Sequence, residues 1–137
     1  MNYIKRSTHG VAVYGKENKV YNKGLIDYVN TLCIRNMSTF QGRKEAVSKL
    51  LLSKTNLPIY VNEDVILYPT KSLREYDSIL INYHNVLSFR SENEGTKIIF
   101  KDLSMLDLTE NSQKIEKQHK KVKNILNHLI SMKIDEN

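Results

Sequence analysis

The sequence has little cysteine and glycine, and it has no long apolar run. Cys33 is the single cysteine among 137 residues, which excludes an intrachain disulfide and fits a reducing, cytoplasmic location. Five glycines are too few for a glycine-rich phosphate loop. No apolar run approaches the ~20 residues of a membrane span. The first seven residues also lack the apolar centre of a signal peptide.

The sequence also lacks the residue groups that mark catalytic or metal sites. His9, His84, His119 and His128 show no recognised ligand spacing, and there is no nucleophile motif or fixed carboxylate pair. A small buried thiol is the simplest interpretation of Cys33. We therefore expect no enzyme, catalytic residue, metal ion, cofactor or small-molecule substrate.

Basic residues outnumber acidic ones, which favours an acidic partner. Lysine and arginine total 21 against 15 aspartates and glutamates, giving a net charge of +6. Nucleic acid is the partner expected first, ahead of an anionic membrane, and we expect nucleic acid rather than a membrane as the partner. The length and ordinary hydrophobic content favour one domain over residues 1–137.

A central helix is predicted over about residues 39–54. Ser38 and Gln41 have the spacing of a capping box, in which each side chain bonds the other residue's backbone N–H. Gly42, Arg43 and Lys44 then fall in the first turn. Cations there oppose the helix dipole, so their presence suggests a bridging anion such as phosphate.

Arg43 has a second interpretation that the spacing leaves open. On a helical wheel it lies near the middle of an apolar face formed by Ala46, Val47, Leu50 and Leu51. Its stem could cover the core while its guanidinium pairs with a carboxylate.

Short strands separated by turn residues predict an α+β fold. Its sheet is expected to be mainly antiparallel and curved or partly closed, with the central helix and a C-terminal helix beside it. Residues 25–34 fit either a helix or a strand. The strands are expected at residues 8–14, 19–21, 57–61, 65–68, 78–89 with a break near Asn85, 96–100 and 105–108.

The C-terminal helix is predicted over about residues 112–132, with Ser112 as its cap. Its apolar stripe should cover the sheet and consists of Ile115, Val122, Ile125, Leu126, Leu129 and Met132. The remaining surface is rich in lysine: Lys114, Lys117, Lys120, Lys121 and Lys123. These lysines form either a solvated face or a secondary phosphate contact.

The order of features in the central stretch resembles the competence transcription factor (ComK) family. The resemblance covers about the middle forty per cent of the chain, and the first thirty residues match poorly. The matching pieces are Cys33, Ser38, Gly42-Arg43-Lys44, the Leu-Pro-Ile at 57–59, the Ile-Leu-Tyr-Pro-Thr at 66–70, Ser72, Arg74 and the apolar strand near 79–86.

The resemblance implies a sequence-specific DNA-binding regulator of competence-transcription-factor type, with one DNA-binding domain. The family is associated with paired A/T-rich boxes, minor-groove contact and more than one protomer on the DNA. Carried onto this chain, the DNA-contact candidates are Gly42, Arg43 and Lys44 with Ser38 beside them, then Thr70, Lys71, Ser72 and Arg74. Arginine suits a narrow A/T-rich minor groove, and lysine suits phosphate.

Two alternatives accompany this interpretation. The chain has no counterpart of the longer tail of fuller family members, so it could bind DNA without activating and compete with a full-length regulator. It could also be a protein-interaction module that uses the last helix and four tyrosines, Tyr60, Tyr68, Tyr76 and Tyr83.

Overall fold

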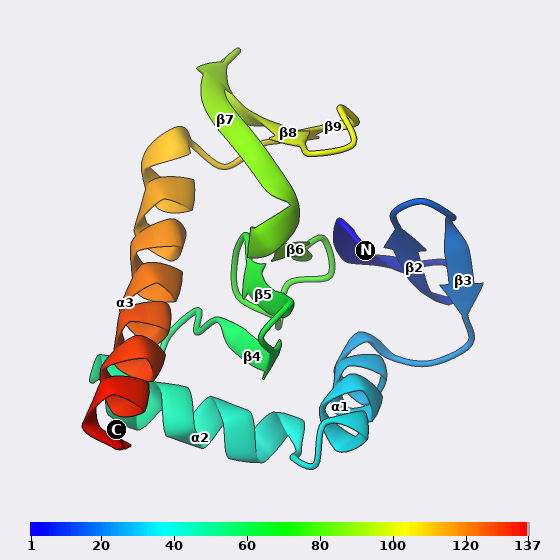
Figure 1. Ribbon diagram of the computed structural model, residues 1–137. Coiled ribbons are helices and arrows are strands. Elements are labelled where there is room, and N and C mark those ends of the chain that lie inside the picture. Colours follow the sequence, from blue (N-terminus) through cyan, green and yellow to red (C-terminus); the bar gives the residue numbers. More distant parts are fainter. Residues whose placement is uncertain (137) are drawn as a thin grey trace.

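The structure, a computed structural model, describes residues 1–136 and contains two antiparallel sheets and three helices there (Figure 1). The larger sheet has the strand order β3-β2-β1-β6-β5-β4, with β1 (Tyr3–Ser7), β2 (Gly10–Tyr14), β3 (Lys19–Tyr21), β4 (Ile59–Asn62), β5 (Val65–Pro69) and β6 (Ile79–Asn82). The smaller sheet contains β7 (Val86–Glu92), β8 (Gly95–Phe100) and β9 (Met105–Leu108). The helices are α1 (Leu25–Arg35), α2 (Phe40–Leu51) and α3 (Ser112–Glu136).

The predicted α+β fold with antiparallel sheets and central and C-terminal helices is confirmed. The sheet is divided in two, however, and neither part closes. A 3-10 helix, Tyr83–Asn85, separates β6 from β7 and confirms the break expected near Asn85.

The first two strands form a hairpin that the sequence patterns did not reveal. Tyr3 pairs with Tyr14 and Ser7 pairs with Gly10, so the chain reverses at residues 8 and 9. The predicted strand over residues 8–14 was therefore wrong at its start. Gly10 has a φ of +140°, and a Cβ there would lie 2.0 Å from the Tyr21 carbonyl oxygen, so only glycine fits this position.

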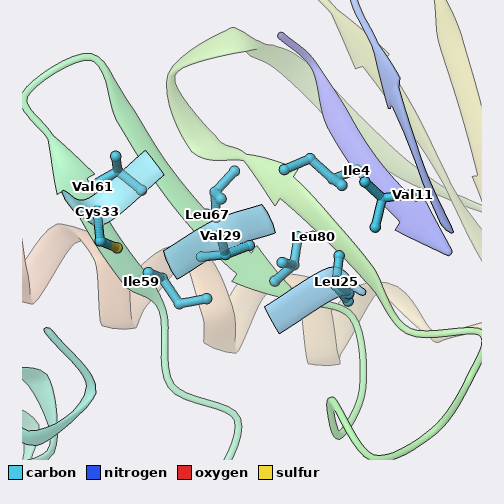
Figure 2. Close-up of a cluster of buried hydrophobic side chains, with 9 residues drawn as sticks. All are labelled: Ile4, Val11, Leu25, Val29, Cys33, Ile59, Val61, Leu67 and Leu80. Atoms are coloured by element: carbon cyan, nitrogen blue, oxygen red, sulfur yellow. The ribbon is translucent and has the colours of Figure 1, made fainter. Parts of the chain in front are cut away.

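The segment that fitted either a helix or a strand is a helix, α1. Leu25, Val29 and Cys33 recur every four residues, and all three side chains are buried. They pack against Ile4 and Leu80 on one face of the larger sheet (Figure 2). This helical face outweighs the strand preference of the residues between them.

The opposite face of the larger sheet packs against the smaller sheet and α3. Ile66 and Ile81 form a second buried core with Ile98 and Phe100 of β8 and Ile115 of α3. The larger sheet is thus covered on both faces, and the 59–82 region lies at the centre of the molecule (Figure 1).

Helix α3 also holds α2 in place. Ile125 is buried with Val47 of α2 and Leu57, so the apolar stripe covers the core as predicted up to Leu129, whereas Met132 at its end is 46% exposed. The cap differs from the prediction. The Asn111 side chain accepts the Lys114 N–H at 3.0 Å, so Asn111 rather than Ser112 caps the helix, and Ser112 is its first residue.

The first two residues fasten the two sheets together. The Asn2 amide donates to the Asp102 carboxylate at 2.9 Å, in the turn between β8 and β9. The side-chain amides of Asn82 and Asn85 donate to the Met1 carbonyl oxygen at 3.0 and 2.7 Å. These contacts fix the junction at which β6 passes into β7.

Candidate nucleic-acid interface

The candidate interface begins where α2 starts, and the helix cap there differs from the prediction. Thr39, rather than Ser38, is the N-cap, because its hydroxyl accepts the Gly42 N–H at 2.9 Å. Gln41 donates to Glu45 instead of reaching back to Ser38. The predicted Ser38–Gln41 capping box is therefore wrong by one position, since the helix begins at Phe40. Half-buried Ser38 lies just before the cap.

Arg43 faces inward from the first turn of α2. Its guanidinium carbon lies 5.1 Å from the centroid of the Tyr60 ring, and its Nη2 donates to the Val61 carbonyl oxygen at 3.5 Å. Its Nε is buried and has no hydrogen-bond partner within residues 1–136. Burial raises the pKa of the Cys33 thiol, and the positive charge of Arg43 partly opposes that rise. Arg43 thus packs helix α2 on β4, as its second interpretation proposed, although it pairs with no carboxylate in the described chain.

Lys44 follows Arg43 but faces the solvent at the rim of a cavity of about 480 Å³. The floor of this cavity is apolar and includes Phe40, Leu57 and Leu73. We call it the basic cavity, because Lys44, Lys54 and Arg74 all line it.

The basic cavity joins the two loops that the sequence singled out separately. Lys44 comes from the start of α2, while Ser72 and Arg74 come from the loop after β5. Lys54, which the motif reasoning missed, comes from the segment after α2. No sequence signal indicated Lys54, because the cavity forms only when β4 and β5 bring these segments together.

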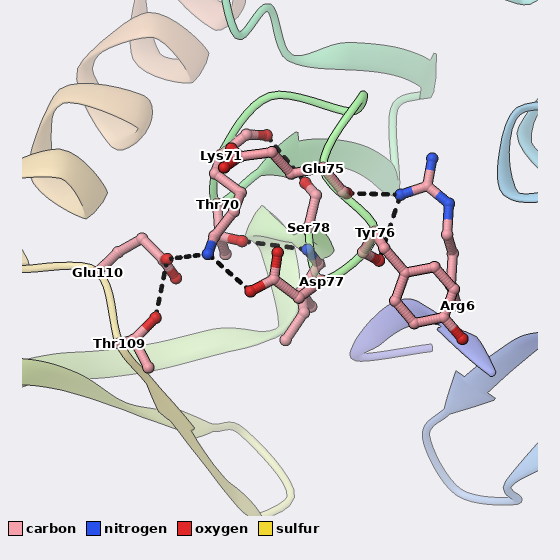
Figure 3. A network of polar contacts seen from close by, with 10 residues as sticks. Arg6, Thr70, Lys71, Glu75, Tyr76, Asp77, Ser78, Thr109 and Glu110 are labelled. Atoms are coloured by element: carbon pink, nitrogen blue, oxygen red, sulfur yellow. Dashed lines mark hydrogen bonds and ion pairs between the residues drawn. The ribbon is translucent and has the colours of Figure 1, made fainter. Parts of the chain in front are cut away.

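Lys71, in contrast, is held inside its loop by two carboxylates (Figure 3). Its Nζ lies 2.9 Å from Asp77 Oδ2 and 3.0 Å from Oε2 of Glu110, which is 8% exposed. Hydrogen bonds to Asp77 and Glu110 raise the pKa of Lys71, and the bond with Lys71 lowers the pKa of Asp77. The charge of Lys71 is already compensated, so this residue holds the loop in place. Buried Thr70 acts similarly, since its Oγ1 accepts the Ile79 N–H at 3.1 Å.

Arg6 of β1 supports the same loop from the other side (Figure 3). Its Nη2 donates to the Leu73 carbonyl oxygen at 2.6 Å, and its Nη1 donates to the Glu75 carbonyl oxygen at 2.8 Å. These bonds fix the backbone on both sides of Arg74 and leave the Arg74 side chain exposed. Arg6 was missed because the N-terminal region carried no motif.

Helix α3 does not line the basic cavity but supports the backbone of two segments that do. Gln118 donates to the carbonyl oxygens of Asn56 and Pro69 at 3.0 and 2.7 Å. Lys121 donates to the carbonyl oxygens of Thr55 and Asn56 at 3.1 and 3.4 Å. Burial, with a contribution from nearby Lys117, lowers the pKa of Lys121. The helix therefore joins the 53–58 segment to the end of β5.

The described residues offer neither a metal site nor a membrane span. Residues 1–136 contain no group of three or more His, Cys, Asp or Glu side chains that could hold a metal ion. None of the described helices is long and apolar enough to cross a bilayer.

Comparison with protein-family models gives a match over nearly the whole chain. The matching model is described as ComK protein and covers residues 2–135 of 137. It includes the first thirty residues, which the motifs left unmatched. The search of curated proteins and the search of solved structures found no match.

Proposed function

Since this chain belongs to the ComK family of competence transcription factors, we propose that it is a sequence-specific DNA-binding regulator that contacts duplex DNA around the basic cavity. The family is one of transcription factors rather than enzymes.

The observation that carries this proposal is the convergence of three uncompensated cations. Lys44, Lys54 and Arg74 belong to three separate segments and meet at one cavity. None of the three forms an ion pair within the described part of the chain. Like charges held together repel each other, and a polyanion removes that cost while releasing counterions.

The proposal gives different roles to the two cations at each place in the chain, Arg43 and Lys44 on α2 and Lys71 and Arg74 on the loop after β5. Lys44 contacts phosphate, and Arg74, on its braced loop, enters an A/T-rich minor groove, where the potential is most negative. Arg43 and Lys71 position these residues, because the first packs on Tyr60 and the second is neutralised by carboxylates.

The smaller candidate residues complete the same surface. Ser38 and Gly42 lie at the start of α2, where the Phe40 and Gly42 N–H groups are already bonded to the side chains of Asn30 and Thr39, so the phosphate contact there falls to the side chain of Lys44. Ser72 lines the cavity beside Arg74, and its hydroxyl can donate to a phosphate oxygen.

Titration of the full chain with A/T-rich and G/C-rich duplexes over a range of salt concentrations tests this interface. Lys44→Gln should weaken both duplexes about threefold to tenfold and lower the salt slope by about one unit. Arg74→Gln should also reduce the preference for the A/T-rich duplex. Lys49→Gln removes the same charge from the far end of α2 and serves as the matched control, with binding like that of the parent.

Folded Lys44→Gln and Arg74→Gln variants that bind as the parent does would reject the basic cavity as the interface. Selection of bound sequences from random duplex DNA at near-physiological salt tests the finer specificity. Enrichment of paired A/T-rich boxes is expected, and an unenriched pool contradicts sequence-specific binding.

A second candidate function is protein interaction, which would also serve association of protomers on DNA. Ile130 and Ile134 lie one turn apart near the end of α3, and their side chains are 57% and 68% exposed. The same salt series separates the two functions, since an apolar interface loses little affinity with added salt.

A further inference from the structure

A second cavity lies on the other flank of α3 from the basic cavity. It has a volume of about 490 Å³ and is lined by residues of α3 and of the start of β7. The two cavities have no lining residue in common. Lys121 contacts the 53–58 segment, whereas Lys123, two residues and about 200° further around the helix, lines the second cavity.

The wall of the second cavity is a fixed group of aromatic rings. The His119 ring centroid lies 4.9 Å from that of Tyr83 and 4.9 Å from that of Phe89. The His119 Nε2 also makes a 2.8 Å hydrogen bond with the buried Tyr68 hydroxyl. Because the rings brace one another, this wall is formed before any ligand arrives.

The charged groups at this cavity are all basic. Lys101 and Lys123 line it and are exposed, and neither forms an ion pair within residues 1–136. No aspartate or glutamate of the described chain is among its lining residues. Burial and the charge of Lys123 lower the pKa of His119 to about 4, so this imidazole is neutral at pH 7.

His84 adds an unsatisfied polar group to the same wall. Its Nε2 is buried and has no hydrogen-bond partner in the described chain. A buried nitrogen without a partner is unfavourable, and a ligand edge that reaches it would remove that cost.

We propose that this cavity binds a nucleoside phosphate, with the phosphate between Lys101 and Lys123 and the base against the aromatic wall. Aromatic rings combined with cations are the usual means of holding a nucleotide. The volume lies within the range of small-molecule sites, about 300–1,000 Å³. The site is separate from the proposed duplex-binding surface and does not depend on it.

The test uses the full ¹⁵N-labelled chain, titrated with adenosine monophosphate and followed by NMR. We expect saturable shifts at the cavity residues and an upward shift of the His119 pKa as the phosphate approaches. Lys101→Gln and Lys123→Gln should each weaken binding at least threefold. Lys120→Gln serves as the matched control, because Lys120 lies on the same helix but does not line the cavity.

Two further titrations complete the design. Titration with a short single-stranded oligonucleotide shows whether the cavity takes a nucleotide within a strand or a free nucleotide. Binding of either ligand at this cavity supports the proposal. Inorganic phosphate should bind at least tenfold more weakly than adenosine monophosphate, because it leaves the aromatic wall unused. The proposal is overturned if neither nucleotide ligand saturates, if the shifts map to Lys44 and Arg74 instead, or if the Lys101 and Lys123 variants bind like the parent.

Discussion

At the scale of single residues, Arg43 and Lys44 show how neighbouring cations acquire different roles. The helix turns by about 100° between them. Arg43 is consequently carried onto the Tyr60 ring, while Lys44 reaches the rim of the basic cavity. Arginine tolerates the half-buried position because its guanidinium is weakly hydrated and stacks on aromatic rings.

Arg43→Ala should lower the free energy of unfolding by about 1–2 kcal/mol, because it removes the contact with Tyr60 and the bond to the Val61 carbonyl oxygen. Lys44→Ala, one residue away and exposed, should stay within about 0.5 kcal/mol of the parent. Chemical denaturation of both variants measures this. An Arg43→Ala protein that is as stable as the parent but has lost A/T preference would instead identify Arg43 as the groove-reading residue.

His119 should make the stability of the protein depend on pH. Its pKa falls from 6.5 to about 4 in the folded chain, chiefly through burial. The unfolded chain therefore binds the proton more tightly than the folded chain does. The stability contributed by the neutral His119 imidazole is complete above pH 6.5 and is lost as the pH falls toward 4. The loss should reach about 2–3 kcal/mol at pH 4.

Denaturation between pH 4 and 7 measures this dependence on His119. His119→Gln keeps a partner for the Tyr68 hydroxyl but cannot titrate, so its stability should vary less over this range. An unchanged pH dependence in that variant would assign the effect to other groups.

At the scale of the elements, α3 is the helix on which both cavities depend. It contacts the second core, helix α2 and the segments beside the basic cavity. Leu126 and Leu129 of the predicted stripe are only half buried, whereas Ile125 is 3% exposed. Ile125 therefore contributes more to the packing than Leu126 or Leu129 does, as do Ile115 and Val122, which are fully buried.

Ile125→Ala should cost about 2–5 kcal/mol, since it opens a cavity beside Val47 and Leu57. Ile130→Ala makes the same chemical change five residues later, where the side chain is 57% exposed, and should cost less than about 0.5 kcal/mol. Thermal and chemical unfolding compare the two. Equal melting temperatures would show that α3 does not stabilise the core.

At the scale of the whole molecule, periodicity predicted the elements whose pattern is local. The hairpin of β4 and β5, the position of α2 and the stripe of α3 follow from apolar spacing and turn residues. Strand β1 was missed because Lys5 and Arg6 interrupt its apolar pattern. The helix caps were each misplaced by one residue, since serine, threonine and asparagine are all competent acceptors there.

The candidate site was predictable only in part, because it depends on contacts distant in sequence. The central motif and its family resemblance indicated Lys44, Ser72 and Arg74, which the fold does bring together. Nothing local distinguished exposed Arg74 from Lys71, whose partner Glu110 is 39 residues away along the chain. Lys54 and the supporting Arg6 likewise acquire their places only from the sheet.

The position of β1 inside the larger sheet also sets an order of events during synthesis. One edge of β1 pairs with β2 at once, but its other edge must wait for β6, roughly 70 residues later in the chain. At translation rates of about 5–20 residues per second, that edge stays open for roughly 4–14 s. During this interval the nascent hairpin presents unpaired backbone groups to neighbouring chains and chaperones. The central position of β1, which helps to hold the finished sheet together, thus leaves one edge of the nascent hairpin unpaired for several seconds.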